Sequence, residues 1–185
     1  MKKLFIACIA MALTSGLNAQ KVKFGIKTGF NIASVNGKDA ANIDAKSDLF
    51  IGATLEVELT DKFSIQPEII YSPQGAKMGS DYTLDLNYVS MPIMVKYYLV
   101  EGFSIEAGPQ FSFLLKDELS TNTSSPDFEN TNAENFDFAL NAGLGYQLKS
   151  GLFFQTRYSL GLTRIFDWDP PVKNGVFQLS LGYQF

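Results

Sequence analysis

The 185-residue chain contains no histidine, a single cysteine and few charged residues, which make up 18% of the total. Without histidine, the chain lacks the commonest general base, the usual serine and cysteine nucleophile pairs, and every metal site that uses an imidazole. Most hydrolase mechanisms are therefore excluded. No apolar run approaches the roughly 20 residues of a transmembrane helix, which excludes helical transporters and channels. The net charge of −4 offers no basic surface for nucleic acid.

The first nineteen residues have the three parts of a secretory signal peptide. Two lysines precede an apolar run from Leu4 to Leu13, and small residues before Gln20 provide a cleavage site after Ala19. The only cysteine, Cys8, lies inside this segment, so the mature chain is expected to form no disulfide. A lipidated cysteine is the alternative, although the apolar run continues past it. We predict a signal peptide over residues 1–19 and one domain over residues 20–185.

From Val22 onward, apolar residues occupy every second position, a pattern typical of half-buried strands. Eight such runs follow one another, and each has 10 to 13 residues. A tilted transmembrane strand needs about 9–11 residues, so every run is long enough to cross a membrane. The runs are Val22–Ile32, Phe50–Leu59, Phe63–Gln74, Tyr88–Val100, Phe103–Leu115, Phe136–Leu148, Leu152–Leu162 and Val176–Phe185.

The connections between these runs alternate in length along the chain: 17, 3, 13, 2, 20, 3 and 13 residues. The short ones, at residues 60–62, 101–102 and 149–151, suit tight hairpins. Because consecutive antiparallel strands reverse direction, the short connections share one end of the sheet and the long ones share the other. Outer-membrane barrels have this asymmetry, with short periplasmic turns, long extracellular loops and an even number of strands.

Alternation alone does not say which face points outward, because a soluble lipocalin-type barrel shows the same pattern reversed. Three observations favour the membrane orientation. The polar face is rich in glycine, which suits the crowded lumen of a narrow barrel. The apolar face carries more bulk than an eight-stranded lumen can contain, and the strands lack the scattered surface lysines and glutamates of soluble barrels. The glycines are Gly25, Gly29, Gly52, Gly108, Gly143, Gly145, Gly161 and Gly182.

The sequence therefore predicts an all-β fold, an eight-stranded antiparallel up-and-down transmembrane β-barrel in the bacterial outer membrane. Outer-membrane lipid is the expected surrounding, and Leu55, Ile93 and Leu140 are expected to touch it. Prolines at 67, 92 and 109 each remove a backbone donor from a barrel that has no free edge, so bulges are expected there. The register near Pro92 is left open.

Four stretches of the chain carry a family resemblance: Gly25–Asn31, Tyr88–Tyr98, Arg157–Leu162 and the C-terminal Leu181–Phe185. They resemble the small outer-membrane β-barrel family that is abundant in Bacteroidetes and often labelled porin-family or PorT-like. The resemblance covers essentially the whole mature chain and implies the same fold and location. It also implies that Tyr183 and Phe185 form the C-terminal signal by which the barrel-assembly machinery recognises its clients during biogenesis. It implies no particular activity.

Four positive and five negative side chains on the polar faces are expected to point into the lumen. Ionised groups in so narrow an interior need partners, because an isolated charge in a low dielectric is strongly destabilising. We therefore predict a salt-bridged plug, with Arg157 held by carboxylates from the two preceding strands, Glu106 and Asp137. A gated proton or ion path is the functional alternative. The nine residues are Lys23, Lys27, Glu56, Glu58, Glu68, Lys96, Glu106, Asp137 and Arg157.

Two long connections are candidate contact surfaces. The acidic loop from Lys116 to Asn135 is rich in serine, threonine and asparagine, as solvated surface loops are. Whether it binds calcium is left open, since no spacing resembles a dedicated oxygen cage. The last loop contains Arg164, Phe166 and Trp168, the chain's only tryptophan. These three residues are candidates for contact with an external partner, although an aromatic there is also typical of a membrane-interface anchor.

The sequence thus predicts a structural or loop-mediated interaction protein with no enzymatic activity, no cofactor and no metal site. Glu56 and Glu58 lie two residues apart on one strand, so they are expected to face lumenal cations rather than form an acid-base pair. A narrow channel for ions or small solutes and a soluble periplasmic ligand-binding barrel are the alternatives.

Overall fold

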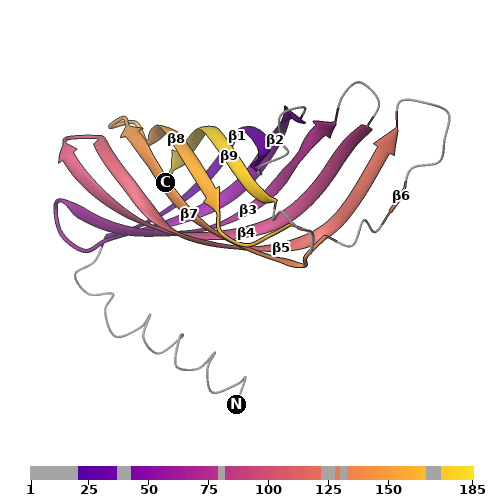
Figure 1. Ribbon diagram of the computed structural model, residues 1–185. Helices are drawn as coiled ribbons and strands as arrows, with labels where there is room; N and C mark the ends of the chain where they lie inside the picture. Colours follow the sequence, from indigo (N-terminus) through magenta and orange to yellow (C-terminus); the bar gives the residue numbers. More distant parts are fainter. Residues whose placement is uncertain (1–20, 37–42, 79–81, 122–127, 130–132, 166–171) are drawn as a thin grey trace, which may run out of the picture.

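The computed structural model describes residues 21–36, 43–78, 82–121, 128–129, 133–165 and 172–185. Within these ranges nine antiparallel strands form one sheet that curls round and closes on itself (Figure 1). No helix among these residues is long and apolar enough to cross a membrane. The strands are β1 (Val22–Asn36), β2 (Ile43–Glu58), β3 (Phe63–Met78), β4 (Tyr82–Val100), β5 (Phe103–Thr121), β6 (Phe128–Glu129), β7 (Phe136–Gln147), β8 (Leu152–Gly161) and β9 (Lys173–Gln184).

Eight of these strands make the wall of the barrel, which confirms the predicted fold. The order β4-β3-β2-β1-β9-β8-β7-β5 is closed by pairing of β4 with β5. The ninth strand, β6, has two residues and pairs with Glu118 and Leu119 of β5, beyond the part of β5 that pairs with β7. Two residues are too few to show an alternation, so β6 could not be predicted from the sequence. We call the end with turns 59–62, 101–102 and 148–151 the short-turn end, and the opposite end the long-loop end.

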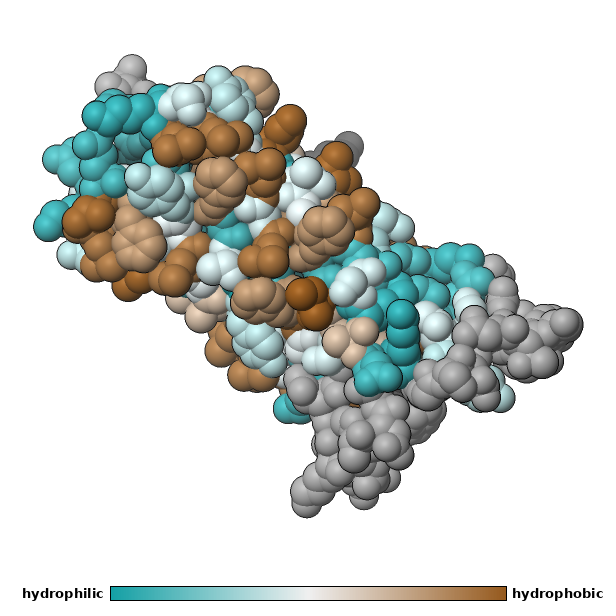
Figure 2. All heavy atoms as spheres, turned by 90° about the horizontal axis from the view of Figure 1, so that it is seen from above, coloured by the Kyte–Doolittle hydropathy of each residue, from teal (hydrophilic) through white to brown (hydrophobic). Residues whose placement is uncertain are grey.

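The apolar face of each strand points away from the lumen. Phe24, Leu49 and Ile69 are more than half exposed, whereas the polar residues Lys27, Glu56 and Glu68 of the same strands are buried. Figure 2 shows apolar side chains over most of the visible outer face and hydrophilic ones gathered towards the ends. The predicted orientation is therefore confirmed. Of the residues expected to touch lipid, Ile93 and Leu140 are exposed and Leu55 is half-buried.

The lumen is crowded, and its inward side chains include four large apolar ones, within the predicted runs, that the alternation did not predict. Each of them lies against a glycine on a neighbouring strand, which leaves room for it. A Cβ on Gly29 would lie 1.8 Å from the carbonyl oxygen of Leu179, so even alanine has no space there. The glycines of the polar face are therefore needed for packing. The pairs are Phe50 with Gly29, Ile70 with Gly52, Met94 with Gly108 and Phe153 with Gly182.

Strands at the long-loop end run past their predicted limits. β3 continues to Met78, β4 begins at Tyr82 and β5 reaches Thr121, although these segments were predicted to be loops. In β4 the alternation is inverted there: Leu84, Leu86 and Tyr88 are apolar and point inward, so this segment could not be joined to the run whose apolar face points outward. The longer strands form a sheet that projects past β7 (Figure 1). We call it the outer wall: residues 43–48, 73–78, 82–88 and 114–121.

The predicted bulges at the prolines are wrong. At each proline one ladder omits two residue pairs and then resumes in the same register: β2–β3 at Pro67, β3–β4 at Pro92 and β4–β5 at Pro109. The ladder on the other side of each proline runs through it, as in the pairs of Pro67 with Ile93, Pro92 with Gln110 and Pro109 with Leu140. In an antiparallel ladder each backbone N–H points to only one neighbouring strand, so proline removes one bond without displacing the chain. The register shifts lie elsewhere, between Ala45 and Ile51, at Asn87/Tyr88 and at Tyr98/Val100.

Arginine in place of Ile93 or Leu140 is expected to lower the free energy of unfolding by about 2–4 kcal/mol, because a charge would face hydrocarbon. Urea unfolding of the protein refolded in lipid vesicles measures this change. Ser47→Arg, on the exposed face of the outer wall, is the matched control and should change stability by less than about 0.5 kcal/mol. Unaltered stability of all three variants would contradict the face assignment.

Candidate functional site

Four charged side chains meet in the middle of the lumen, and we call them the central cluster: Lys27, Glu68, Glu106 and Arg157. None is more than 6% exposed. Arg157 donates from Nη1 and Nη2 to the two carboxylate oxygens of Glu68 at 3.0 and 2.9 Å. It also donates from Nε and Nη2 to Glu106 Oε1 at 3.1 and 2.9 Å. Lys27 Nζ lies 2.7 Å from Glu68 Oε2, so two positive and two negative charges cancel.

The pair of Arg157 and Glu68 joins opposite walls of the barrel. Arg157 belongs to β8 and Glu68 to β3, and these strands are four places apart in both directions round the closed sheet. Arg157 also reaches Glu106 on β5 over the strand between them, β7, where Gly143 is paired with both residues. A planar guanidinium with two carboxylates fixes both distance and direction. The pair therefore braces the lumen across its width.

Of the two carboxylates predicted to hold Arg157, only Glu106 does so. Asp137 is buried nearer the long-loop end, where it accepts hydrogen bonds from Thr163 Oγ1 and from Asn174 Nδ2. The prediction considered neighbouring strands alone. It missed Glu68 because a contact across the lumen depends on how the sheet closes, which no local spacing reveals.

A second set of hydrogen-bonded polar side chains links the central cluster to the short-turn end. Lys96 Nζ lies 2.8 Å from Glu56 Oε2 and donates to Gln66 Oε1 at 3.1 Å. Gln66 Nε2 in turn donates to Glu68 Oε1 at 2.7 Å. Nearer the mouth, Tyr98 Oη donates to Glu56 Oε1 at 2.6 Å. Hydrogen bonds therefore connect Tyr98 at the mouth with Glu68 at the centre.

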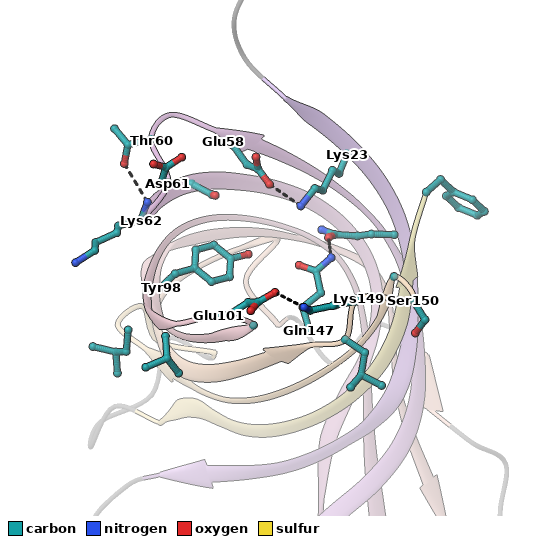
Figure 3. A pocket seen from close by; sticks show the side chains of 18 residues that line it. Lys23, Glu58, Thr60, Asp61, Lys62, Tyr98, Glu101, Gln147, Lys149 and Ser150 are labelled. Atoms are coloured by element: carbon teal, nitrogen blue, oxygen red, sulfur yellow. Dashed lines mark hydrogen bonds and ion pairs between the residues drawn. The ribbon is translucent and has the colours of Figure 1, made fainter.

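The mouth at the short-turn end holds a cavity of about 640 Å³. Two ion pairs stand on its rim, Lys23 with Glu58 at 2.5 Å and Lys149 with Glu101 at 3.0 Å (Figure 3). Its lining reaches inward as far as Ser64, and no member of the central cluster belongs to it. The cavity is therefore a shallow vestibule.

Apolar side chains close the long-loop end of the lumen. Ile165, which follows β8, is 2% exposed and packs against the inner face of the outer wall. Its N–H donates to the carbonyl of Val172 at 2.8 Å, and its carbonyl accepts from the N–H of Glu134 at 2.8 Å. Both bonds hold the side chain in place. We call this group the outer seal: Ala76, Leu84, Leu86, Tyr88 and Ile165.

An outward apolar face and a lumen filled with paired charges are properties of a membrane barrel. In agreement, the profile of the family described as outer membrane protein beta-barrel domain matches residues 18–167. The chain belongs to this family. The protein is accordingly an integral β-barrel of the bacterial outer membrane, embedded in lipid.

Solved structures of two other outer-membrane barrels are similar to this family member. For Ail, the attachment invasion locus protein of Yersinia pestis, the identity is 16% over 89% of this chain and 99% of that chain, with a TM-score of 0.55. For neisserial surface protein A (NspA), the identity is 10% over 88% of this chain and 97% of that chain, with a TM-score of 0.58. At these identities the likeness shows the fold. No curated protein matches the chain.

The structure places the remaining predicted residues as follows. Tyr183 and Phe185 face outward at the short-turn end, with ring centroids 5.2 Å apart. Arg164 is exposed beside the outer seal, whereas Phe166, Trp168 and the predicted signal peptide lie outside the described residues. The predicted acidic loop begins later than expected, because residues 116–121 belong to β5. Within the described ranges, no group of three or more acidic or cysteine side chains is placed to hold a metal ion.

Removing the guanidinium is expected to destabilise this outer-membrane protein strongly. Arg157→Ala leaves Glu106 without a cation partner inside the barrel, and breaking a buried pair from one side costs about 3–5 kcal/mol. Arg157→Lys should recover part of that loss, because an ammonium cannot form the planar bidentate contact. Urea unfolding in detergent micelles measures both. A loss under about 1 kcal/mol for Arg157→Ala, typical of an exposed pair, would show that the central cluster is wet and loosely held.

Proposed function

We propose that this barrel has a structural or interaction role, in which it presents the outer wall and its loops at the cell surface. The observation that carries the proposal is that the lumen is obstructed twice. The central cluster fills its middle with paired charges, and the outer seal fills its long-loop end with packed apolar side chains. Side chains commonly fill the interior of an eight-stranded barrel, which leaves the outer surface as the functional face.

Conduction of ions or small solutes is less well supported than a structural or interaction role. A conducting lumen needs a continuous polar path in which ions bind and leave. Here each charge of the central cluster is held by another charge of the same cluster, and the side chains of the outer seal are apolar apart from the hydroxyl of Tyr88.

Catalysis and soluble ligand transport also find little support. Glu56 is paired with Lys96 and Glu58 with Lys23, so these carboxylates do not form an acid-base pair with each other. Small outer-membrane barrels of this kind are generally non-enzymatic. A soluble carrier would bury its apolar side chains in the lumen, whereas this barrel turns them outward.

The outer wall carries opposite charges in contact with one another. Lys46 Nζ lies 2.5 Å from both Asp48 and Asp85, and Lys116 Nζ lies 2.7 Å from Glu118. Ail, which shares the fold, has been solved in complex with the heparin analogue sucrose octasulfate. That likeness supports a contact role for the surface of this protein. The paired lysines favour a partner of mixed charge over a polyanion.

Purified protein in a planar bilayer is expected to show no stable, large conductance steps. Ile165→Ser, which weakens the outer seal, should behave in the same way because the central cluster still obstructs the lumen. Large steps from the unaltered protein would overturn the proposal. Steps from Ile165→Ser alone would show that the central cluster does not close the barrel.

Cysteine labelling on intact cells tests the display of the outer wall. Lys77→Cys lies on the outer wall and Lys62→Cys on a short turn, and both positions are exposed. A membrane-impermeant maleimide should label the first on intact cells and the second only after the outer membrane is permeabilised. The reverse pattern would mean that the outer wall faces the periplasm.

A further inference from the structure

A hollow of about 630 Å³ lies on the lipid-facing side of β1, β9, β8 and β7, with Leu49 of β2 and Phe103 of β5 also in its lining, and it is separate from the mouth. Its lining consists of outward side chains and the backbone between them. The volume falls within the range of about 300–1,000 Å³ that small-molecule sites occupy. The outer surface of this barrel is therefore not uniformly convex.

The hollow exists because two threonines stand among large neighbours. Thr28 of β1 and Thr156 of β8 both line it, and each is paired with a leucine of β9 that lies between them. Phe30 and Phe154, which follow and precede these threonines by two residues on the same outward faces, are about half exposed and form its sides. Short side chains at 28 and 156 thus make its floor.

One of the two threonine hydroxyls in the floor of the hollow is bonded to the barrel backbone. Thr28 Oγ1 donates to the carbonyl of Phe50 at 2.7 Å, so its hydrogen bond is made to the barrel itself. What the bilayer brings to such a surface is hydrocarbon, and an acyl chain that packs closely against the hollow gains dispersion contacts without any polar partner. A second copy of this barrel would bring a convex face of bulky side chains, which cannot follow a concave hollow as a flexible acyl chain can.

The position of the hollow also selects a leaflet. Phe103 and Tyr146 line it at the short-turn end, and Gln147, next to Tyr146, donates its N–H to the carbonyl of Gly102 in the turn. Amphipathic tyrosines commonly lie at the level of lipid headgroups. We propose that this hollow, which we call the acyl groove, holds one fatty acyl chain of a phospholipid from the leaflet at the short-turn end. The inference rests on the outer-membrane location and is independent of the proposed surface role.

Native mass spectrometry of the purified barrel with dipalmitoyl phosphatidylethanolamine tests the proposal. The unaltered protein should retain one phospholipid per barrel. Thr28→Leu with Thr156→Leu fills the groove and should reduce the retained fraction about tenfold, because the acyl chain loses its packing contacts there. Ala53→Leu with Ala107→Leu is the matched control, since these small residues face outward away from the groove. The control should retain lipid like the unaltered protein.

Circular dichroism and heat-modifiable gel migration establish that both double variants are folded barrels. Equal retention by the filled and control variants would overturn the acyl groove. So would a dimer of the unaltered protein that disappears on filling the groove without any lipid adduct, because the hollow would then fit a second copy of the chain.

Discussion

Arg157 and Glu68 hold opposite walls of the barrel together at a distance set by two parallel hydrogen bonds. Both are buried, so neither charge can be screened by bulk water, and each depends on the other and on Lys27 and Glu106 for neutralisation. Buried ion pairs are weak evidence for net stability, but removal of one partner is strongly destabilising. The central cluster therefore specifies how the strands face each other more than it adds to stability.

The same closure explains the distribution of glycine and of large inward side chains. Where Phe50, Ile70, Met94 or Phe153 points inward, the neighbouring strand has a glycine, whose missing side chain leaves space. Gly143 likewise leaves space on β7 where the side chain of Arg157 passes over this strand to reach Glu106. The lumen is thus layered from the short-turn end: a vestibule, the Lys96–Glu56 pair, the central cluster, neutral amides and hydroxyls such as Asn31 and Gln178, and the outer seal.

Sequence reasoning predicted what depends on local periodicity. The alternation of apolar and polar residues predicted eight strands and the direction of their faces. The high cost of an isolated charge in a narrow lumen predicted that Arg157 pairs with lumenal acids. Sequence reasoning failed where the fold departs from that period. The outer wall was missed because in β4 the alternation is inverted there, with Leu84 and Leu86 apolar on the inner face. The contact of Arg157 with Glu68 could not be derived from spacing, and the prolines were absorbed without bulges because one lost bond does not shift an antiparallel ladder.

A double-mutant cycle across the lumen tests the central claim most directly. Arg157→Met and Glu68→Gln are combined and unfolded in lipid vesicles, with Arg157→Met and Asp137→Asn as the matched pair whose members do not touch. The cross-lumen brace predicts a coupling energy of about 1–3 kcal/mol for the first pair and additivity within about 0.5 kcal/mol for the second. Additivity of both pairs would mean that Arg157 and Glu68 do not hold each other inside the barrel.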